Sequence, residues 1–258
     1  MKLLICMALI LCVVIPARGE IVTKAVIYKH GDVELEGFLA WDNANNAKRP
    51  GMLVVHEWTG LNDYAKMRCR QLAEMGYVAF AADMYGKGIR PQTRDEAAAQ
   101  ASIYRGDRQL MRDRVTAGLN VLMNNELCDN SRIAAIGYCF GGGTVLELAR
   151  SGAAIAGVVS FHGNLDTPDP SVAKNIKCKV LVCHGADDPY VPMEQITAFF
   201  DEMRAAGVDY QFIAYSGTVH AFTNPGSGDD PLTGAAYNAE ADRRSWGHMK
   251  MFFGELFE

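Results

Sequence analysis

Short apolar runs alternate along this chain with longer segments in which apolar residues recur at helical spacing. Two runs near the start, 22–28 and 34–40, are rich in strand formers and are separated by the turn-like His30-Gly31-Asp32, which predicts an antiparallel hairpin. The later runs are almost wholly apolar, as is typical of strands buried on both faces of a parallel sheet. They comprise residues 51–55, 77–82, 133–137, 157–161, 180–184 and 210–215.

Helical periodicity fills most of the intervals between these runs. Apolar residues recur there at steps of three and four with charged residues between them, which predicts helices packed on one side. The segments are 62–74, 108–123, 142–150, 193–206 and 235–253. The alternation predicts an α/β fold with a mainly parallel sheet of about eight strands and helices on both faces. No repeat or long linker interrupts it, so residues 20–258 are expected to form a single domain.

Residues 1–19 do not follow this pattern. Lys2 is followed by an apolar stretch over 3–15 and then by Pro16-Ala17-Arg18-Gly19, a layout typical of a secretory signal peptide. We expect cleavage between Gly19 and Glu20 and an exported protein, periplasmic or secreted. The alternative is a buried first strand or helix. No later apolar run approaches the roughly 20 residues of a membrane-spanning helix, so no membrane anchor is expected after signal removal.

Charge and cysteine content narrow the function classes. The chain carries 25 Lys and Arg against 30 Asp and Glu, a formal net charge of −5, so no nucleic-acid partner is expected. After Cys6 and Cys12 leave with the signal, the remainder of the seven cysteines is odd, which indicates at least one free thiol. No zinc or thioredoxin-like spacing is present. Disulfide pairing is left open for Cys69, Cys128, Cys178 and Cys183.

One strand-to-helix turn carries a cysteine between glycines. The run 133–137 leads into Tyr138-Cys139-Phe140-Gly141, and 144–150 has helical character. This G-x-C-x-G pattern predicts a nucleophile elbow, where glycines remove side chains that would collide. Such a turn places Cys139 at a helix N-terminus, which favours the thiolate, and directs the N–H of Phe140 toward an oxyanion. A tight helix–strand crossing without chemistry is the alternative.

A cysteine nucleophile in this kind of sheet needs an acid and then a histidine later in the chain. The run 180–183 ends in a loop with Asp187 and Asp188, and the run 210–215 is followed by His220. Parallel sheets bind ligands at the carboxyl ends of their strands, so these loops are expected beside Cys139. Taken alone, Asp188 would be a capping or turn aspartate and His220 a surface histidine. Asp187 is the better candidate for a local role of that kind.

These residues resemble the dienelactone hydrolase family of the α/β-hydrolase superfamily. The resemblance covers almost all of residues 20–258, and its most specific parts are G-Y-C-F-G-G at 137–142, H-G-A-D-D-P-Y-V-P at 184–192 and H-A-F at 220–222. It implies an α/β-hydrolase fold. In that family the acid stands three residues before the Val-Pro pair, which selects Asp188 over Asp187.

The resemblance also implies roles for residues in the loop 56–62. A glutamate in this loop of the family is displaced by substrate and deprotonates the cysteine, which assigns that role to Glu57. The N–H of Trp58 would be the second oxyanion donor. A capping or loop carboxylate is the alternative for Glu57. Where the family places arginines that hold a substrate carboxylate, this chain has Lys87 and Asn224, so dienelactone itself is not the expected substrate.

The predicted reaction is hydrolysis of a small ester or lactone. Cys139 would attack the carbonyl and form a thioester acyl-enzyme, while His220, oriented by Asp188, moves the proton. The N–H groups of Phe140 and Trp58 would hold the oxyanion, and water would release the acid. No cofactor or metal is expected.

Several points remain open from the sequence. The alternative functions are an exported carboxylesterase, thioesterase or peptidase acting on another substrate class, and a non-catalytic ligand-binding member of the fold. Tyr138, beside the cysteine, joins Lys87 and Asn224 as a candidate substrate-binding residue. His162, after the sixth strand, is interpreted as a loop histidine with a structural role, and the oligomeric state is not predicted.

Overall fold

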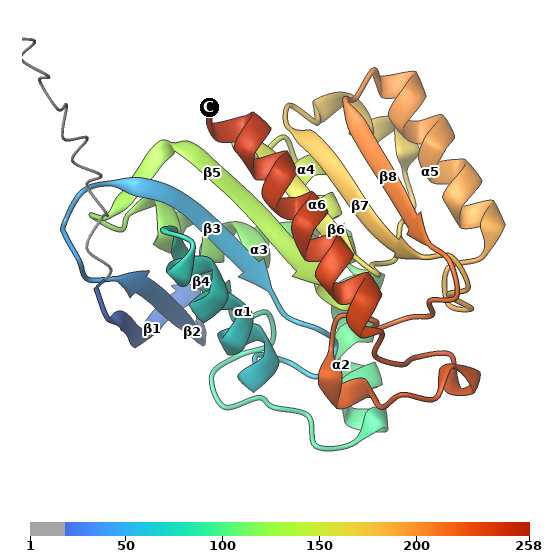
Figure 1. The fold of residues 1–258 in the computed structure, drawn as a ribbon, viewed down its shortest axis with the longest axis horizontal. Coiled ribbons are helices and arrows are strands. Elements are labelled where there is room, and N and C mark those ends of the chain that lie inside the picture. Colours follow the sequence, from blue (N-terminus) through green and yellow to red (C-terminus); the bar gives the residue numbers. More distant parts are fainter. Residues whose placement is uncertain (1–18) are drawn as a thin grey trace, which may run out of the picture.

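A computed structural model describes residues 19–258, and the signal peptide predicted over residues 1–19 therefore lies, except for Gly19, outside the described residues. Eight strands form one sheet in the order β1-β2-β4-β3-β5-β6-β7-β8, which Figure 1 shows as a twisted surface between helices. The strands are β1 (Ile21–His30), β2 (Val33–Asp42), β3 (Arg49–Val55), β4 (Val78–Ala82), β5 (Cys128–Tyr138), β6 (Gly157–Phe161), β7 (Lys179–Gly185) and β8 (Tyr210–Tyr215).

The sheet is mainly parallel, as predicted. β1 and β2 form the expected antiparallel hairpin, and β2 joins the rest by antiparallel pairing with β4. From β4 to β8 each neighbouring pair is parallel. The carboxyl ends of these parallel strands therefore meet at one edge of the sheet, and the loops that follow β3, β5, β7 and β8 converge there.

Helices cover both faces of the sheet. They are α1 (Asp63–Glu74), α2 (Arg94–Gly106), α3 (Arg108–Met123), α4 (Phe140–Arg150), α5 (Met193–Ala206) and α6 (Ala239–Phe257). Figure 1 shows α1 and α6 in front of the sheet and α3 and α4 behind it. The fold class predicted from the sequence is confirmed.

The alternating sides of β3 explain why its whole run is apolar. Met52 and Val54 belong to the core under α1 and α6, whereas Leu53 and Val55 belong to the core under α3, α4 and α5. Successive side chains of a strand point to opposite faces of the sheet. A central strand that helices cover on both faces therefore has no position for a polar side chain. The same reason accounts for the other continuous runs.

The helix α2 was not expected from the sequence. It buries only Ala97, Ala101 and Tyr104, and it begins at an N-cap where the Thr93 side chain accepts from the Glu96 N–H. Alanines contribute little contrast between an apolar and a polar face, so the helical periodicity is weak although alanine favours helix.

Two further observations concern disulfides and membranes. Cys69, Cys128, Cys139, Cys178 and Cys183 are all free and buried, which answers the pairing question left open by the sequence. Between residues 19 and 258, no helix combines the length and apolar character that crossing a bilayer requires.

Candidate active site

The turn between β5 and α4 holds Cys139 in a strained backbone conformation. Its φ is 53° and its ψ is −114°, a backbone conformation that residues other than glycine rarely adopt. A Cβ on Gly137 would collide with the carbonyl oxygen of Gly141, and a Cβ on Gly141 would collide with the carbonyl oxygen of Val55. The two glycines thus permit a close approach of β5, α4 and β3, and Cys139 lies at the N-terminus of α4 as the motif predicts.

The structure brings the predicted triad residues together. The His220 Nε2 lies 3.1 Å from the Cys139 Sγ, and the His220 Nδ1 lies 2.7 Å from the Asp188 Oδ2. The other carboxylate oxygen, Asp188 Oδ1, accepts from the N–H of Tyr190 at 2.9 Å, which orients the carboxylate. Cys139, Asp188 and His220 expose 6%, 6% and 8% of their surfaces, so the contacts between them are largely shielded from water.

Electrostatics at the triad favour a charged imidazole. Burial alone would lower the pKa of His220, but the Cys139 sulfur and the Asp188 carboxylate outweigh burial and raise this pKa well above its usual value. An imidazolium beside the sulfur stabilises a thiolate, which is the nucleophilic form of cysteine.

Glu57 lies at the same site but is held by another partner. Its Oε2 accepts a hydrogen bond from the Asn224 Nδ2 at 2.6 Å, and the Asn224 Oδ1 accepts from the N–H of Gly226 at 2.8 Å. Burial raises the pKa of Glu57. Within residues 19–258 this carboxyl makes no hydrogen bond to Cys139, so the sulfur is held by His220 alone.

The two backbone groups assigned to the oxyanion belong to adjoining segments. Within the described part of the chain, neither the N–H of Trp58 nor that of Phe140 donates a hydrogen bond. The Trp58 carbonyl accepts from the Tyr85 hydroxyl at 2.8 Å, which fixes its peptide group. Because the β3 end packs against Gly141, the Trp58 loop adjoins the start of α4.

Two predicted substrate-binding residues do not reach the site. Lys87 is exposed, and its Nζ forms an ion pair with the Glu34 Oε1 at 2.6 Å on β2. Tyr138 is fully buried, and its ring stacks on Phe161 at 4.8 Å. The reason is strand alternation: the side chain of Tyr138 points into the core under α1 and α6, away from Cys139. Direct substrate contact by Lys87 or Tyr138 is therefore corrected.

His162 is the site residue whose importance the sequence did not reveal. It follows β6, has a φ of 41°, and is fully buried. Its Nδ1 accepts from the N–H of Cys139 at 3.1 Å, and its Nε2 lies 2.7 Å from the Thr223 Oγ1. A histidine at the carboxyl end of the strand beside β5 was the available signal. Asp187, the other residue left open, is exposed.

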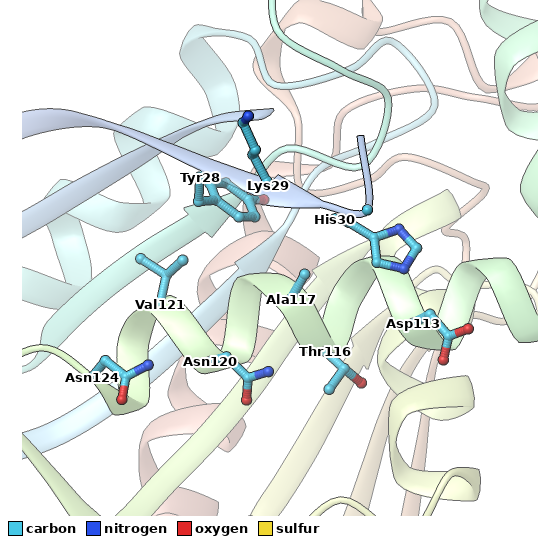
Figure 2. A pocket seen from close by; sticks show the side chains of 10 residues that line it. Tyr28, Lys29, His30, Asp113, Thr116, Ala117, Asn120, Val121 and Asn124 are labelled. Carbon is cyan, nitrogen blue, oxygen red and sulfur yellow. The ribbon is translucent and has the colours of Figure 1, made fainter. Parts of the chain in front are cut away.

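A surface depression lies away from the triad and is not part of the candidate active site. It has a volume of about 480 Å³ and lies between the end of β1 and α3, where Figure 2 shows His30, Asp113, Thr116 and Asn120 around it. No triad residue lines it. Within residues 19–258, no three His, Cys, Asp or Glu side chains gather so as to hold a metal ion.

Fold and site together define a class. The features of an α/β-hydrolase are present. They are a mainly parallel sheet with an antiparallel hairpin at one edge, a strained turn after β5, and Cys139, Asp188 and His220 in that order on the loops after β5, β7 and β8. The model of the dienelactone hydrolase family matches residues 35–257. The chain belongs to this family of hydrolases, and the resemblance seen in its motifs is confirmed.

Known proteins similar to this chain fit that placement. A solved structure named m3DLH has 40% identity and a TM-score of 0.90, covering 93% of this chain and 100% of that one. The dienelactone hydrolase-like promiscuous phosphotriesterase P91 from metagenomic libraries has 42% identity and a TM-score of 0.89, with the same coverages. A putative carboxymethylenebutenolidase of Methylorubrum extorquens is 28% identical over 184 residues, 67% of this chain and 63% of that protein.

Proposed function

We propose that this hydrolase cleaves small uncharged esters or lactones through a thioester on Cys139. The observation that carries the proposal is the unbroken contact from the Cys139 Sγ to the His220 Nε2, 3.1 Å, and from the His220 Nδ1 to the Asp188 Oδ2, 2.7 Å. A nucleophile within reach of a base that a third group orients is the arrangement covalent catalysis requires.

In the proposed cycle, the Cys139 thiolate attacks the carbonyl carbon, and the N–H groups of Phe140 and Trp58 hold the oxyanion. The carbon–oxygen bond of the ester breaks, and protonated His220 gives its proton to the leaving oxygen. His220 then takes a proton from water, whose oxygen attacks the thioester and releases the acid. Asp188 keeps the imidazole oriented throughout.

Glu57 has a secondary role in this proposal. It is paired with Asn224 at rest. In molecules whose Cys139 is still a neutral thiol, substrate entry exchanges that partner for the thiol proton, as the family resemblance implies. Burial raises the pKa of Glu57, which makes its carboxylate a stronger base toward the thiol.

The preference for uncharged substrates follows from two side chains. Where the family holds a substrate carboxylate with arginines, Lys87 is paired with Glu34 and Asn224 is a neutral amide already bound to Glu57. A carboxylate in the substrate would meet the buried Glu57 carboxyl, and the Arg68 guanidinium, whose charge acts on Glu57, is already paired with Asp242 at 2.6 Å.

The test is turnover of p-nitrophenyl acetate and a panel of neutral and carboxylated lactones by the purified protein. We expect activity on neutral substrates that iodoacetamide abolishes, loss of activity in Cys139→Ala, and an acylated Cys139 peptide by mass spectrometry after acid quench. Full activity in Cys139→Ala, or inactivity of the wild type with an unreactive Cys139, would contradict the proposal; the latter would favour a ligand-binding role.

A second candidate activity is hydrolysis of uncharged phosphotriesters. The relative with 42% identity over 93% of this chain is named a promiscuous phosphotriesterase. Incubation with diethyl p-nitrophenyl phosphate should release a first p-nitrophenolate per chain rapidly, with a diethylphosphoryl adduct on Cys139 after acid quench. Release should then continue as water cleaves the sulfur–phosphorus bond and frees diethyl phosphate. Release without an adduct, unchanged in Cys139→Ala, would exclude this activity for the site.

We also propose that the enzyme acts outside the cytoplasm, on the strength of the signal pattern in residues 1–19. Protein recovered from the periplasm or medium of producing cells should begin at Glu20 by N-terminal sequencing. Retention in the cytoplasm with residues 1–19 still attached would contradict export.

A further inference from the structure

A buried chain of hydrogen bonds lies behind the triad. The N–H of Cys139 donates both to the Phe161 carbonyl at 3.0 Å and to the His162 Nδ1 at 3.1 Å. On its other side, the His162 Nε2 lies 2.7 Å from the Thr223 Oγ1. The Thr223 Oγ1 in turn lies 2.6 Å from the Tyr64 hydroxyl, which accepts from the Arg68 Nε at 3.2 Å.

The direction of the hydrogen bonds is fixed at the His162 end of this network. Because the His162 Nδ1 accepts from a backbone N–H, the proton of the neutral ring is on Nε2, which donates to the Thr223 Oγ1. Either hydroxyl can donate in the next bond, between Thr223 and Tyr64, and the Tyr64 hydroxyl can instead donate to the Thr223 carbonyl at 3.3 Å. A neutral His162 agrees with its pKa, which burial lowers well below the usual value.

This chain of hydrogen bonds connects two loops that must keep a fixed separation. One end holds the backbone of Cys139, and the other holds Thr223, three residues after His220. The Thr223 carbonyl also accepts from the Arg68 Nη2 at 2.8 Å. The His162 and His220 rings meet edge to face at 5.3 Å. His162 is thus in contact with the backbone of the sulfur-bearing residue, the ring of the base, and the loop of the base.

We propose that His162 is a positioning residue that, through Thr223, sets the separation between the Cys139 sulfur and the His220 imidazole. This inference rests on the proposed function, because it assigns His162 a task only if Cys139 and His220 act as a pair. A small error in such a separation is costly, since a displacement of about 1 Å can reduce the rate by about 100-fold.

The variants separate the two hydrogen bonds of the ring. His162→Phe keeps a ring but neither bond, whereas His162→Asn keeps an acceptor near the Nδ1 position and tolerates the left-handed backbone at φ 41°. Thr223→Val removes only the hydroxyl, and Thr223→Ser restores it. Ser245→Ala is the matched control, because Ser245 is equally buried but bonds within α6, to the Asp242 carbonyl.

Two readouts are measured on each folded variant: kcat and KM for p-nitrophenyl acetate, and the rate of iodoacetamide alkylation of Cys139 against pH, followed on the Cys139 peptide. We expect kcat of His162→Phe and Thr223→Val to fall by about 10- to 100-fold with little change in KM. The midpoint pH of alkylation should rise, because a displaced His220 stabilises the thiolate less. Thr223→Ser should recover most of both values. His162→Asn, which keeps the bond to the Cys139 N–H but lacks the bond to Thr223, should resemble Thr223→Val, and Ser245→Ala should match the wild type.

The two hypotheses fail in different ways. If wild-type Cys139 is alkylated with the same pH profile as in His220→Ala, the proposed catalytic pair itself is wrong. If the wild type shows a His220-dependent profile but His162→Phe and Thr223→Val keep it, together with wild-type kcat, the positioning role is overturned and the catalytic pair stands. A lower Tm with unchanged kcat and profile overturns it too. Should His162→Phe not fold, the Thr223→Val and Thr223→Ser pair decides the question.

Discussion

At the scale of single residues, backbone strain is concentrated where the chemistry is proposed. Within residues 19–258, the non-glycine residues with positive φ are Cys139, His162 and Ala221, at 53°, 41° and 57°. Each such conformation costs of order 1–3 kcal/mol and persists only where its surroundings hold it. Here the Cys139 N–H is held by two acceptors, and Ala221 follows the base directly. The strain therefore marks the same site that the side-chain contacts define.

The orientation of the histidine can be tested with Asp188→Asn. An amide in place of the carboxylate can donate to the His220 Nδ1 and so force the ring proton onto Nε2, where it faces the sulfur and cannot accept the thiol proton. We expect kcat to fall by up to about 10⁴-fold with the fold retained.

Asp187→Asn is the matched control, because it makes the same chemical change one residue earlier on an exposed side chain. It should retain wild-type kcat on the same ester. Equal losses in both variants would mean that Asp188 has no specific role.

Glu57→Gln tests the buried carboxyl through the pH dependence of stability. Burial raises the pKa of Glu57 above its usual 4.5, so the folded state favours the neutral acid. Its contribution to stability is complete below pH 4.5 and is lost as pH rises through the folded pKa. Glutamine is neutral at every pH and can still accept from Asn224. We expect Tm of Glu57→Gln to exceed that of the wild type at pH 8 and to match it at pH 4.

The exposed Glu255 provides the control, since Glu255→Gln should leave the difference in Tm independent of pH. A Glu57→Gln protein that is less stable than the wild type at pH 8 would show that the ionised carboxylate is favoured by its surroundings.

At the scale of secondary-structure elements, the site depends on how closely α4 approaches β3 and β5. A Cβ added at Gly141 would collide with the carbonyl oxygens of Val55 and His56, and one added at Gly142 would collide with the Ser160 hydroxyl and Gly163. A side chain at Gly141 would separate the helix N-terminus from the loop that carries Trp58. The glycines therefore bring the two proposed oxyanion donors, the N–H groups of Phe140 and Trp58, near each other and place Cys139 at the helix N-terminus.

Gly141→Ala should accordingly destabilise the protein. The added Cβ has only backbone atoms to displace, so we expect a loss of about 1–3 kcal/mol in the free energy of unfolding by urea, with lower kcat.

Gly247→Ala is the comparison, because Gly247 lies within α6 with open space around its Cβ position. It should be neutral or stabilising by up to about 1 kcal/mol. Stability equal to the wild type in Gly141→Ala would contradict the close approach.

At the scale of the whole molecule, the sequence predicts those structural features whose pattern lies within a single segment. Each central strand is a continuous apolar run, so every one of them was found, whereas α2 was missed because its buried face is mostly alanine. Contacts between residues that are distant in the sequence could not be predicted from it. Nothing near Lys87 indicates that Glu34 captures it, and Tyr64 and Thr223, which meet at 2.6 Å, are 159 positions apart.

One long-range contact ties the rear of the molecule together and can be tested. Arg150 on α4 is 1% exposed, and its guanidinium binds both oxygens of Glu202 on α5 at 2.7 Å, Glu147 at 2.9 Å and the Leu165 carbonyl at 2.8 Å. Arg150→Met leaves Glu202 buried without its cation, so we expect a loss of about 3–5 kcal/mol in the free energy of unfolding.

Arg204→Met is the control, since Arg204 pairs with Asp201 at 3.5 Å on the surface of the same α5 and should matter little. A similar small effect in Arg150→Met would show that the core tolerates the unpaired carboxylate.

The near-complete enclosure of the sulfur and the imidazole has a consequence for what this enzyme can accept. Because only 6% of Cys139 and 8% of His220 is exposed to solvent, only a bond at the end of a narrow substrate group can reach them. Width at the scissile end, rather than overall length, is then the dimension that decides between one ester and another. We therefore expect acetyl esters to react faster than branched-acyl esters of the same alcohol when their kcat/KM values are compared.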